Sequence, residues 1–343
     1  MKYIEIIYPD DWHVHLRDKD CLPDTVQATA FSFLRALAMP NLAQPVTTID
    51  DLLQYRERII KATPKSAQFL PYMTLYLNDQ TTAETLNQAK KFDFILGAKL
   101  YPQHATTNSA LGAANILDLY PLFEVMQTND LVLQVHGEDV TADIFDKEER
   151  FINNFLKPIC KQFPRLRVVL EHISTKAAID FVTNTKANIA ATITPHHLLY
   201  NRNDLLNQGI KPHLYCLPIL KRREDQAALR LAATSGNPKF FAGTDSAPHA
   251  KNEKESNCGC AGIFSSPYAV AIYAQIFEDL NKLDYLEAFL SKFGAEFYNL
   301  PLNQQTLTLA KRSQTIPFEL PFGKNKVVPI AAGESIAWSI YEH

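Results

Sequence analysis

The sequence has little glycine and cysteine, and its few cysteines are scattered. Only 11 of its 343 residues are glycine and 5 are cysteine. An odd number of widely spaced cysteines in a long chain argues against a disulfide framework. The one cluster, Cys258-Gly259-Cys260, has neither the CxxC spacing nor the second cysteine pair of a structural zinc site. We therefore expect the cysteines to be reduced thiols.

An excess of charge of one sign is also lacking, as are targeting and membrane-spanning segments. The 34 basic and 37 acidic side chains leave a formal net charge of -3, which excludes the strongly basic surface typical of nucleic-acid-binding proteins. The first residues, Met1 to Glu5, lack the apolar core and the small-residue cleavage site of a signal peptide. No stretch approaches the apolar length of a membrane span. These absences predict a cytoplasmic protein that acts on neither nucleic acid nor a membrane.

The sequence does contain a regular alternation of apolar runs and helical patterns. Runs such as Val168-Val169-Leu170 are continuously apolar, which is typical of parallel strands buried on both faces. A strand followed by a helix, repeated about eight times, predicts an α/β fold, and the chain length favours a closed (β/α)8 TIM barrel. No GxGxxG motif follows the first strand, which counts against a dinucleotide-binding sheet. The predicted strands are 12–16, 33–39, 69–77, 95–100, 131–135, 167–170, 189–193 and 240–243, and the predicted helices 50–60, 82–89, 117–127, 147–163, 175–184 and 224–233.

The ends of the chain are expected to add little to this barrel. No internal repeat, low-complexity tract or linker stands out, which predicts one domain over residues 1–343. A short strand at 4–8 is expected to close the bottom of the barrel. The tail from about Pro301 is rich in proline and β-forming residues, and we interpret 301–343 as a short irregular extension packed on the barrel.

Side chains that bind metals fall near the ends of predicted strands. His13 and His15 lie two residues apart on the first strand, so both point to the same face. His136, His172 and Asp245 each end a later strand, at the edge where barrel enzymes build their active sites. A single histidine in such a place is more often structural, but the whole set predicts a metal site suited to Zn²⁺ or a related divalent ion.

Lys99 ends another apolar run, where an ammonium group would be costly beside metal cations. A neutral lysine amine can react with CO2 to give a carbamate, whose two oxygens can bridge two metal ions. The alternative is an ordinary lysine whose ammonium reaches solvent. The surrounding ligand set favours the carbamate, so we predict N6-carboxylysine at position 99 and two Zn²⁺ ions, with other divalent metals as alternatives.

Two side chains near this set, Arg17 and His249, predict an anionic substrate. Arg17 lies two residues beyond His15, so it points to the same face if the strand continues. Its guanidinium offers a planar fork to a carboxylate. His249 follows Asp245 by four residues and could contact the same carboxylate. A surface arginine and a loop histidine are the alternatives.

Other polar residues near the strand ends could have either a functional or a structural role. Asn41 can both donate and accept hydrogen bonds, although a turn asparagine is the alternative. Thr106 and Thr107 follow the Lys99 strand and suit a lid over the substrate, or an ordinary polar loop. His196 and His197 are adjacent, so on a strand they would point opposite ways, and we expect structural roles rather than shared metal binding.

Longer motifs surround these residues and cover the chain from about residue 3 to beyond residue 300. They are DWHVHLRD from Asp11, MPN from Met39, KLYP from Lys99, ATTNS from Ala105, TPHHL from Thr194, CLPILK from Cys216, GTDSAPH from Gly243 and CGCAG from Cys258. Together they resemble the amidohydrolase superfamily and, within it, the shorter, single-domain bacterial dihydroorotases. Lys19 departs from the usual glycine of that pattern, and His196 from the usual glutamine.

The resemblance implies a role for each candidate. One metal ion is implied to be held by His13, His15, carboxylated Lys99 and Asp245, and a second ion by Lys99, His136 and His172. The substrate is implied to contact Arg17, Asn41 and His249 through its carboxylate, and the backbone around Leu217 and Ala261. The mobile loop that closes over it is implied to carry Thr106 and Thr107.

The activity implied is the reversible hydrolysis of the cyclic amide of (S)-dihydroorotate to N-carbamoyl-L-aspartate, a step of de novo pyrimidine (UMP) biosynthesis. A metal-bridging hydroxide would attack, with Asp245 as general acid and base. The absence of a GxSxG motif is consistent with attack by water. A homodimer is implied as well. Two alternatives remain: another cyclic amidase such as a hydantoinase or allantoinase, and a metal-free homologue that serves as a binding partner.

Overall fold

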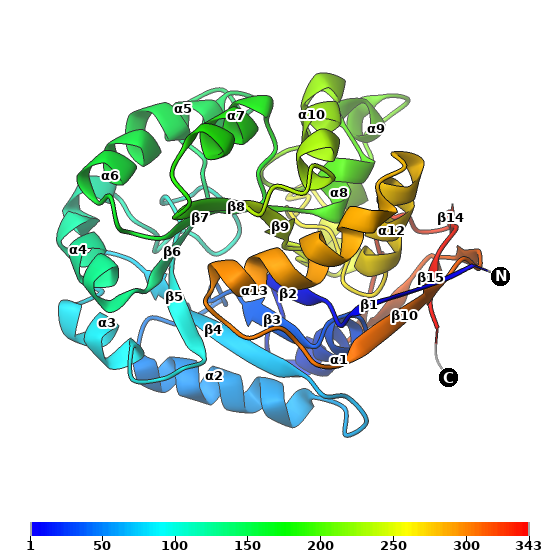
Figure 1. The fold of residues 1–343 in the computed structure, drawn as a ribbon, viewed down its shortest axis with the longest axis horizontal. Helices are drawn as coiled ribbons and strands as arrows, with labels where there is room; N and C mark the ends of the chain where they lie inside the picture. Colours follow the sequence, from blue (N-terminus) through cyan, green and yellow to red (C-terminus); the bar gives the residue numbers. More distant parts are fainter. Residues whose placement is uncertain (1, 342–343) are drawn as a thin grey trace.

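A barrel of parallel strands forms the centre of the computed structural model, which describes residues 2–341 (Figure 1). Within these residues the eight-stranded sheet follows chain order: β2 (Asp10–Val14), β3 (Arg35–Ala38), β4 (Leu70–Leu77), β5 (Ile95–Leu100), β6 (Val132–Val135), β7 (Val168–Leu170), β8 (Ile189–Ile193) and β9 (Phe240–Ala242). The ring closes just beyond β2 and β9, where Asp245 N donates to His13 O at 2.8 Å and His15 N to Ser246 O at 3.0 Å. The predicted (β/α)8 barrel is confirmed.

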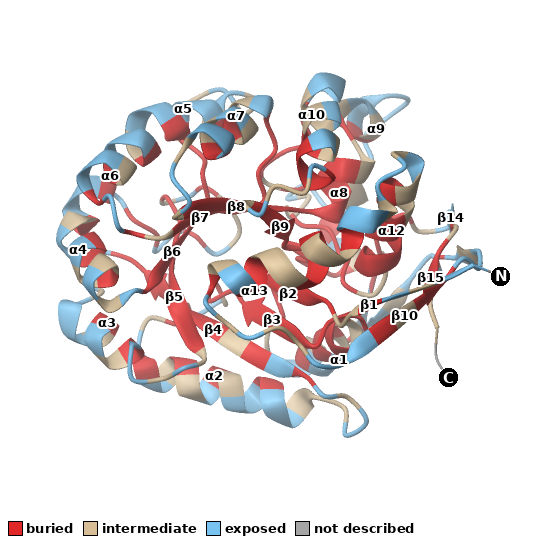
Figure 2. Cartoon of the chain, viewed as in Figure 1, coloured by how far each residue is buried: buried red, intermediate tan, exposed pale blue. Residues whose placement is uncertain are grey.

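Each predicted strand overlaps an observed one, and β5 and β8 have the predicted bounds. The strands are buried along almost their whole length, with helices around them whose exposed faces point outward (Figure 2). Side chains fill the inside of the barrel while helices cover the outside, so both faces of each strand must be apolar. This is why the strands could be recognised as continuous apolar runs.

The surrounding helices show the local signals that start and bury a helix. In α2 (Ile49–Ala62), Thr48 caps the first turn by accepting from Asp51 N at 3.1 Å, and Leu52, Tyr55 and Ile59 bury one face. The other α-helices are α1 (Leu22–Ser32), α3 (Ala83–Ala89), α4 (Tyr120–Asn129), α5 (Lys147–Phe151), α6 (Lys157–Gln162), α7 (Lys176–Asn184), α8 (Pro195–Leu199), α9 (Arg202–Leu206), α10 (Arg223–Ala233), α11 (Lys251–Lys254), α12 (Ala269–Asp279) and α13 (Phe293–Phe297). A π-helical segment, Ile152–Leu156, joins α5 to α6, so the predicted helix at 147–163 is one continuous element.

The predicted closure of the barrel bottom by residues 4–8 is wrong. That segment forms β1 (Tyr3–Ile7), which pairs antiparallel with β10 (Thr306–Ala310) at the side of the barrel. Helix α13 instead lies across the end of the barrel that faces the viewer in Figure 1. Trp12, at that end, stacks on Tyr298 with ring centroids 4.8 Å apart. A Cβ on Gly294 would lie only 2.0 Å from Trp12 Nε1, so the close approach of α13 requires glycine there.

The C-terminal extension contains more regular structure than expected. Strand β10 also pairs with β15 (Ser339–Ile340), and β11 (Gln314–Thr315) pairs with β14 (Ser335–Ile336). A hairpin joins β12 (Leu320–Phe322) to β13 (Asn325–Val327). The extension is tied to the barrel helices through Trp338 Nε1, which donates to Glu278 on α12 at 3.0 Å.

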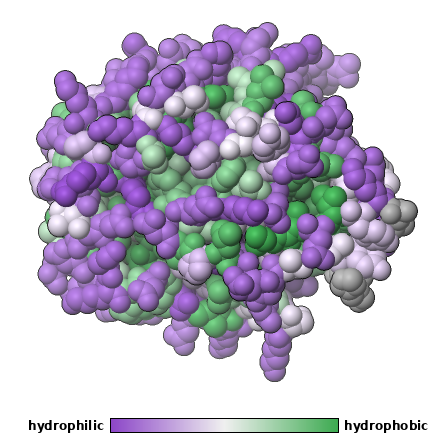
Figure 3. Space-filling view, viewed as in Figure 1, coloured by the Kyte–Doolittle hydropathy of each residue, from purple (hydrophilic) through white to green (hydrophobic). Residues whose placement is uncertain are grey.

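The surface around the barrel is largely hydrophilic. In Figure 3 polar and charged side chains cover the rim of the face seen in Figure 1, and hydrophobic ones gather toward its centre. No helix within residues 2–341 combines the length and the apolar character needed to cross a bilayer.

Candidate metal centre and substrate pocket

Three predicted ligands meet where the barrel closes. His13 Nε2 lies 3.3 Å from His15 Nε2, and Asp245 Oδ1 lies 3.4 Å from the first and 3.0 Å from the second. All three side chains are buried, with at most 9% of any of them exposed. Two imidazole nitrogens and a carboxylate oxygen packed together in this way form a set of donors suited to a divalent cation.

The orientation of His13 is set from behind by Glu171. His13 Nδ1 lies 2.9 Å from Glu171 Oε2, which also accepts from Thr192 Oγ1 at 2.6 Å. Thr192 Oγ1 in turn accepts from the backbone N–H of His172 at 2.7 Å. A carboxylate on Nδ1 favours the tautomer in which Nε2 keeps its lone pair toward His15 and Asp245.

Of the two later histidines, His172 lies beside His13, and His136 lies beside His172. The ring of His172 is 4.9 Å from that of His13 and 4.8 Å from that of His136, measured between centroids. His136 Nε2 is held by Glu138 Oε2 at 2.8 Å, which leaves its Nδ1 for a ligand. His172 Nδ1 is buried without a hydrogen-bond partner among residues 2–341.

Lys99 is fully buried beneath this group. Its Nζ has no hydrogen-bond partner within the described chain and lies 5.1 Å from the ring centre of Tyr101. Burial lowers the pKa of Lys99 to about 8, against the opposing charges of Glu171 and Asp245. The buried amine is therefore easily made neutral, which is the form that reacts with CO2.

Burial also keeps three of the four imidazoles in the form that binds metal. It lowers the pKa of His15 to about 4 and lowers the pKa values of His136 and His172. Burial acts on His13 in the same direction, but the charge of Glu171 and hydrogen bonds to Asp245 and Glu171 outweigh it and raise the pKa of His13. Burial would raise the pKa of Asp245, but hydrogen bonds with His13 and His15 outweigh this and hold it well below its usual value. Neutral imidazoles beside an ionised carboxylate are what a divalent cation requires.

The backbone at the site is strained where ligands leave their strands. His172 and Asp245 have φ of 42° and 44°, and Arg17 has φ of 60°, values that side chains other than glycine rarely adopt. Thr244 anchors the turn before Asp245, since its backbone N–H donates to Asp11 Oδ1 at 2.8 Å. The condition under which Arg17 would share the face of His15, a strand that continues to residue 17, is not met, because β2 ends at Val14.

Four of the five predicted substrate-binding residues line a small pocket above the ligand set, with a free volume of about 20 Å³. Its lining consists of His15, Arg17, Asn41, Tyr101, Thr106, Thr107, His136, His172, Leu217, Asp245, Ala247, Ala261 and Gly262. The predicted lid is closed over it: Asn41 Nδ2 donates to Thr107 O at 3.1 Å, and Thr107 Oγ1 donates to Ala261 O at 3.4 Å. The structure thus brings the lid and the pocket residues together around one small space.

His249 lies at the edge of this pocket, beside Arg17. Its Nε2 is 3.1 Å from Arg17 Nη2 and also 3.1 Å from Ala261 O, while Arg17 Nε donates to Pro248 O at 2.9 Å. Burial and, after it, the charge of Arg17 together lower the pKa of His249 to about 2. The imidazole is therefore neutral and can donate from only one nitrogen.

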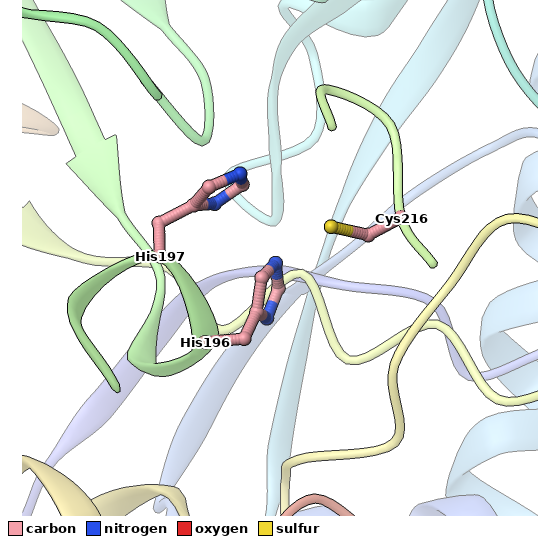
Figure 4. Close-up of side chains that lie close together, drawn as sticks. All are labelled: His196, His197 and Cys216. Carbon is pink, nitrogen blue, oxygen red and sulfur yellow. The ribbon is translucent and has the colours of Figure 1, made fainter. Parts of the chain in front are cut away.

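His196, His197 and Cys216 form a second buried group (Figure 4). The two histidines lie on helix α8 rather than on a strand. The alternation of side chains along a strand therefore does not direct them to opposite faces. His197 Nε2 and Cys216 Sγ both lie near Pro218 O, at 3.0 and 3.3 Å, and this shared acceptor accounts for their convergence. Neither ring nitrogen of His196 has a hydrogen-bond partner within residues 2–341.

Several residues that shape the site were missed from the sequence. Glu171 and Glu138 hold ligand histidines, and Thr192 and Thr244 hold the turns. The two glutamates could have been found, because each lies within two residues of a candidate ligand: Glu171 precedes His172, and Glu138 follows His136 by two residues. No local pattern reveals the threonines, because their partners lie on other strands. Lys19 has φ of 58°, which explains why glycine suits that position.

Fold and site together define a class: a parallel barrel with metal-ligand side chains at the carboxyl ends of its strands, as in metal-dependent hydrolases. In agreement, the model of the Amidohydrolase family matches residues 6–305. The dihydroorotase of Coxiella burnetii (strain RSA 331 / Henzerling II) is 52% identical over 345 residues, covering 100% of this chain and 99% of the relative. That of Aliivibrio fischeri (strain MJ11) is 53% identical over 342 residues, covering 99% and 100%.

Solved structures agree. The dihydroorotase of Campylobacter jejuni has a TM-score of 0.92 at 36% identity, covering 99% of this chain and 98% of the other. That of Saccharomyces cerevisiae, in complex with 5-fluoroorotic acid, has a TM-score of 0.91 at 33% identity and 99% coverage of both chains. An L-hydantoinase from Arthrobacter aurescens shares the fold, with a TM-score of 0.82 at 15% identity. The chain therefore belongs to the dihydroorotases of the amidohydrolase family.

Proposed function

We propose that the chain interconverts (S)-dihydroorotate and N-carbamoyl-L-aspartate in pyrimidine biosynthesis. Water adds to the ring carbonyl carbon and the cyclic C–N amide bond breaks, and the reverse reaction closes the ring. The observation that carries the proposal is the convergence of His13, His15 and Asp245 directly beneath a small pocket that has Arg17 at its edge. In this arrangement one bound substrate would contact both the proposed metal centre and the guanidinium of Arg17.

The residues fit two divalent cations bridged by a modified lysine. His13, His15 and Asp245 would hold one ion, His136 and His172 the other, with Lys99 as its carbamate shared between them. The unpaired and buried Lys99 Nζ and His172 Nδ1 support this assignment, because each lacks a partner among residues 2–341. When bound, zinc ions would polarise the scissile carbonyl and make water a better nucleophile at neutral pH.

The substrate carboxylate binds at the Arg17 end of the pocket. A neutral His249 cannot both accept from Arg17 and donate to Ala261 O through the same nitrogen. A carboxylate between the two side chains would accept from Arg17 and from His249 Nε2 together, which relieves this competition. Asn41 adds a third donor once it exchanges its bond to the Thr107 carbonyl for the ligand.

Asp245 acts as the general base and then as the general acid. As an ionised carboxylate beside the pocket, it accepts a proton from the attacking water and returns it to the ring nitrogen as the amide bond breaks. The backbone at Leu217 orients the ring amide, and the backbone at Ala261 lies beside the carboxylate. Thr106 and Thr107 close the lid and exclude bulk water.

A turnover assay on purified, zinc-supplemented protein tests the proposal. Hydrolysis of L-dihydroorotate is followed at alkaline pH beside hydantoin and allantoin, and the binding of 5-fluoroorotate is measured by calorimetry. We expect turnover of dihydroorotate alone. Turnover of hydantoin or allantoin instead would retain the metal centre and overturn the substrate assignment.

We further propose that residues 1–343 form one domain, supported by the pairing of β1 with β10, and that the protein is a cytoplasmic homodimer, on the basis of the family resemblance. Analytical ultracentrifugation tests the dimer, which a single species with the mass of one chain would contradict.

A further inference from the structure

Lys254, the last residue of α11, is a buried lysine with an unusual set of partners. Its Nζ donates to three backbone carbonyl oxygens, those of Tyr215 at 2.7 Å, Cys260 at 2.8 Å and Gly262 at 2.8 Å. The residue is only 3% exposed, and these three partners are all neutral backbone oxygens. A buried ammonium is costly unless it is fully hydrogen-bonded, so this arrangement needs all three carbonyls.

These carbonyls belong to two segments that form one wall of the substrate pocket. One segment leads from Tyr215 to Leu217, and the other contains Ala261 and Gly262. The segments also meet directly, because Gly262 N donates to Tyr215 O at 2.9 Å. Lys254 therefore sits behind the wall and joins both halves of it.

The pattern of partners determines which way the carbonyl between them faces. Cys260 O and Gly262 O point to Lys254, whereas Ala261 O lies near His249 Nε2 and the lid hydroxyl of Thr107. With its two neighbours held, the Ala261 peptide has little freedom to turn away from the pocket. The backbone there is already constrained, since Gly262 has φ of 151° and a Cβ on it would lie 2.2 Å from Ala247 O.

We propose that Lys254 is a positioning residue for the substrate ring: it fixes the backbone at Leu217 relative to that at Ala261, so that both meet the ring amides and carboxylate in register. This inference rests on the proposed function, which assigns those two backbones to the substrate. Burial lowers the pKa of Lys254 to about 8, so at neutral pH the side chain is protonated and has three N–H donors for its three acceptors.

The experiment compares Lys254→Met, which keeps the length of the side chain and removes its donors, with Lys251→Met on the same helix. Lys251 is a suitable control because it is partly exposed, pairs with Glu319 and does not line the pocket. For Lys254→Met we expect KM for dihydroorotate to rise about tenfold, with kcat changed less than about twofold. The Kd for 5-fluoroorotate should rise in parallel, and Lys251→Met should match the wild type.

A merely structural role would lower kcat, through loss of active protein, and leave KM unchanged, and that result would overturn the proposal. Wild-type KM and Kd in the Lys254 variant would also overturn it. If Lys254→Met does not fold, Lys254→Gln, which keeps two donors, undergoes the same measurements. If the wild type fails to turn over dihydroorotate, the proposed function fails, and the affinity for 5-fluoroorotate alone then decides the role of Lys254.

Discussion

At the scale of single residues, the ligand candidates depend on buried partners that orient them. His13 and His136 are each held through one ring nitrogen by a carboxylate, from Glu171 and Glu138. The other ring nitrogen is directed to the proposed metal centre, and the glutamate sets the tautomer of the imidazole. Sequence patterns indicated the ligand candidates, because strand ends are local features. They indicated the partners of these candidates less well, since Thr192 and Glu171 meet only after two strands pair.

Loss of the partner charge behind His13 is expected to weaken metal binding. Replacing Glu171 with glutamine leaves a neutral acceptor on His13 Nδ1 and buries an additional N–H group without a partner. We expect metal affinity or activity to fall by about 10- to 100-fold, because the loss of a hydrogen-bond partner of a metal-binding histidine typically has an effect of this size. Zinc titration with a competing chelator measures it, with Glu149→Gln on the exposed face of α5 as the control. Equal affinities in the two variants would contradict the role of Glu171.

His196 predicts a pH dependence of stability. Burial lowers its pKa to about 4 in the folded protein, whereas the unfolded value is about 6.5. Between these values the unfolded state binds the additional proton, so stability is lost as the pH falls from about 6.5 to about 4. A full shift of this size corresponds to roughly 3 kcal/mol.

The test compares urea unfolding of the metal-free wild type and His196→Gln at pH 4 and pH 6.5. Glutamine does not titrate, so the variant should lose less stability than the wild type over this interval, and the difference isolates His196 from the other buried histidines. The same loss in both proteins would show that His196 does not titrate in this way.

At the scale of elements, the proposed lid is the part of the site that we expect to move. Residues 106 and 107 follow β5 in a loop that meets Asn41 and Ala261 across the pocket, and both bonds must open for substrate to enter. The sequence indicated a polar loop after the Lys99 strand. That the loop lies closed depends on contacts with residues far away in the chain, which no local pattern contains.

Removal of the lid hydroxyl should weaken closure without disturbing the metals. Thr107→Val keeps the shape of the side chain and removes its bond to Ala261 O. We expect kcat/KM to fall by up to about tenfold, the value of one hydrogen bond, with metal content unchanged. Leu111→Ala, an exposed position on the same loop, is the control. Unchanged kcat/KM in Thr107→Val would exclude this contact from catalysis.

At the scale of the whole molecule, the barrel could be predicted because its eight strands are buried on both faces and are recognisable one by one. The segment at 4–8 also has a strand pattern, but its partner β10 lies about 300 residues further along the chain, so its place beside the barrel could not be inferred. Closure of the barrel by α13 depends in the same way on the contact between Gly294 and Trp12. Long-range packing, rather than local propensity, therefore determines both the position of β1 and the closure of the barrel by α13.

The most direct test of the central claim is the metal content per chain, measured together with dihydroorotate turnover, for the wild type and Lys99→Ala. We expect two zinc ions and rapid turnover for the wild type, and loss of bridged metal with at least about 100-fold lower kcat/KM for the variant. Lys90→Ala, an exposed lysine on the C-terminal side of α3, should behave like the wild type. If Lys99→Ala kept both ions and full turnover, the bridging lysine and the binuclear site built around it would be contradicted.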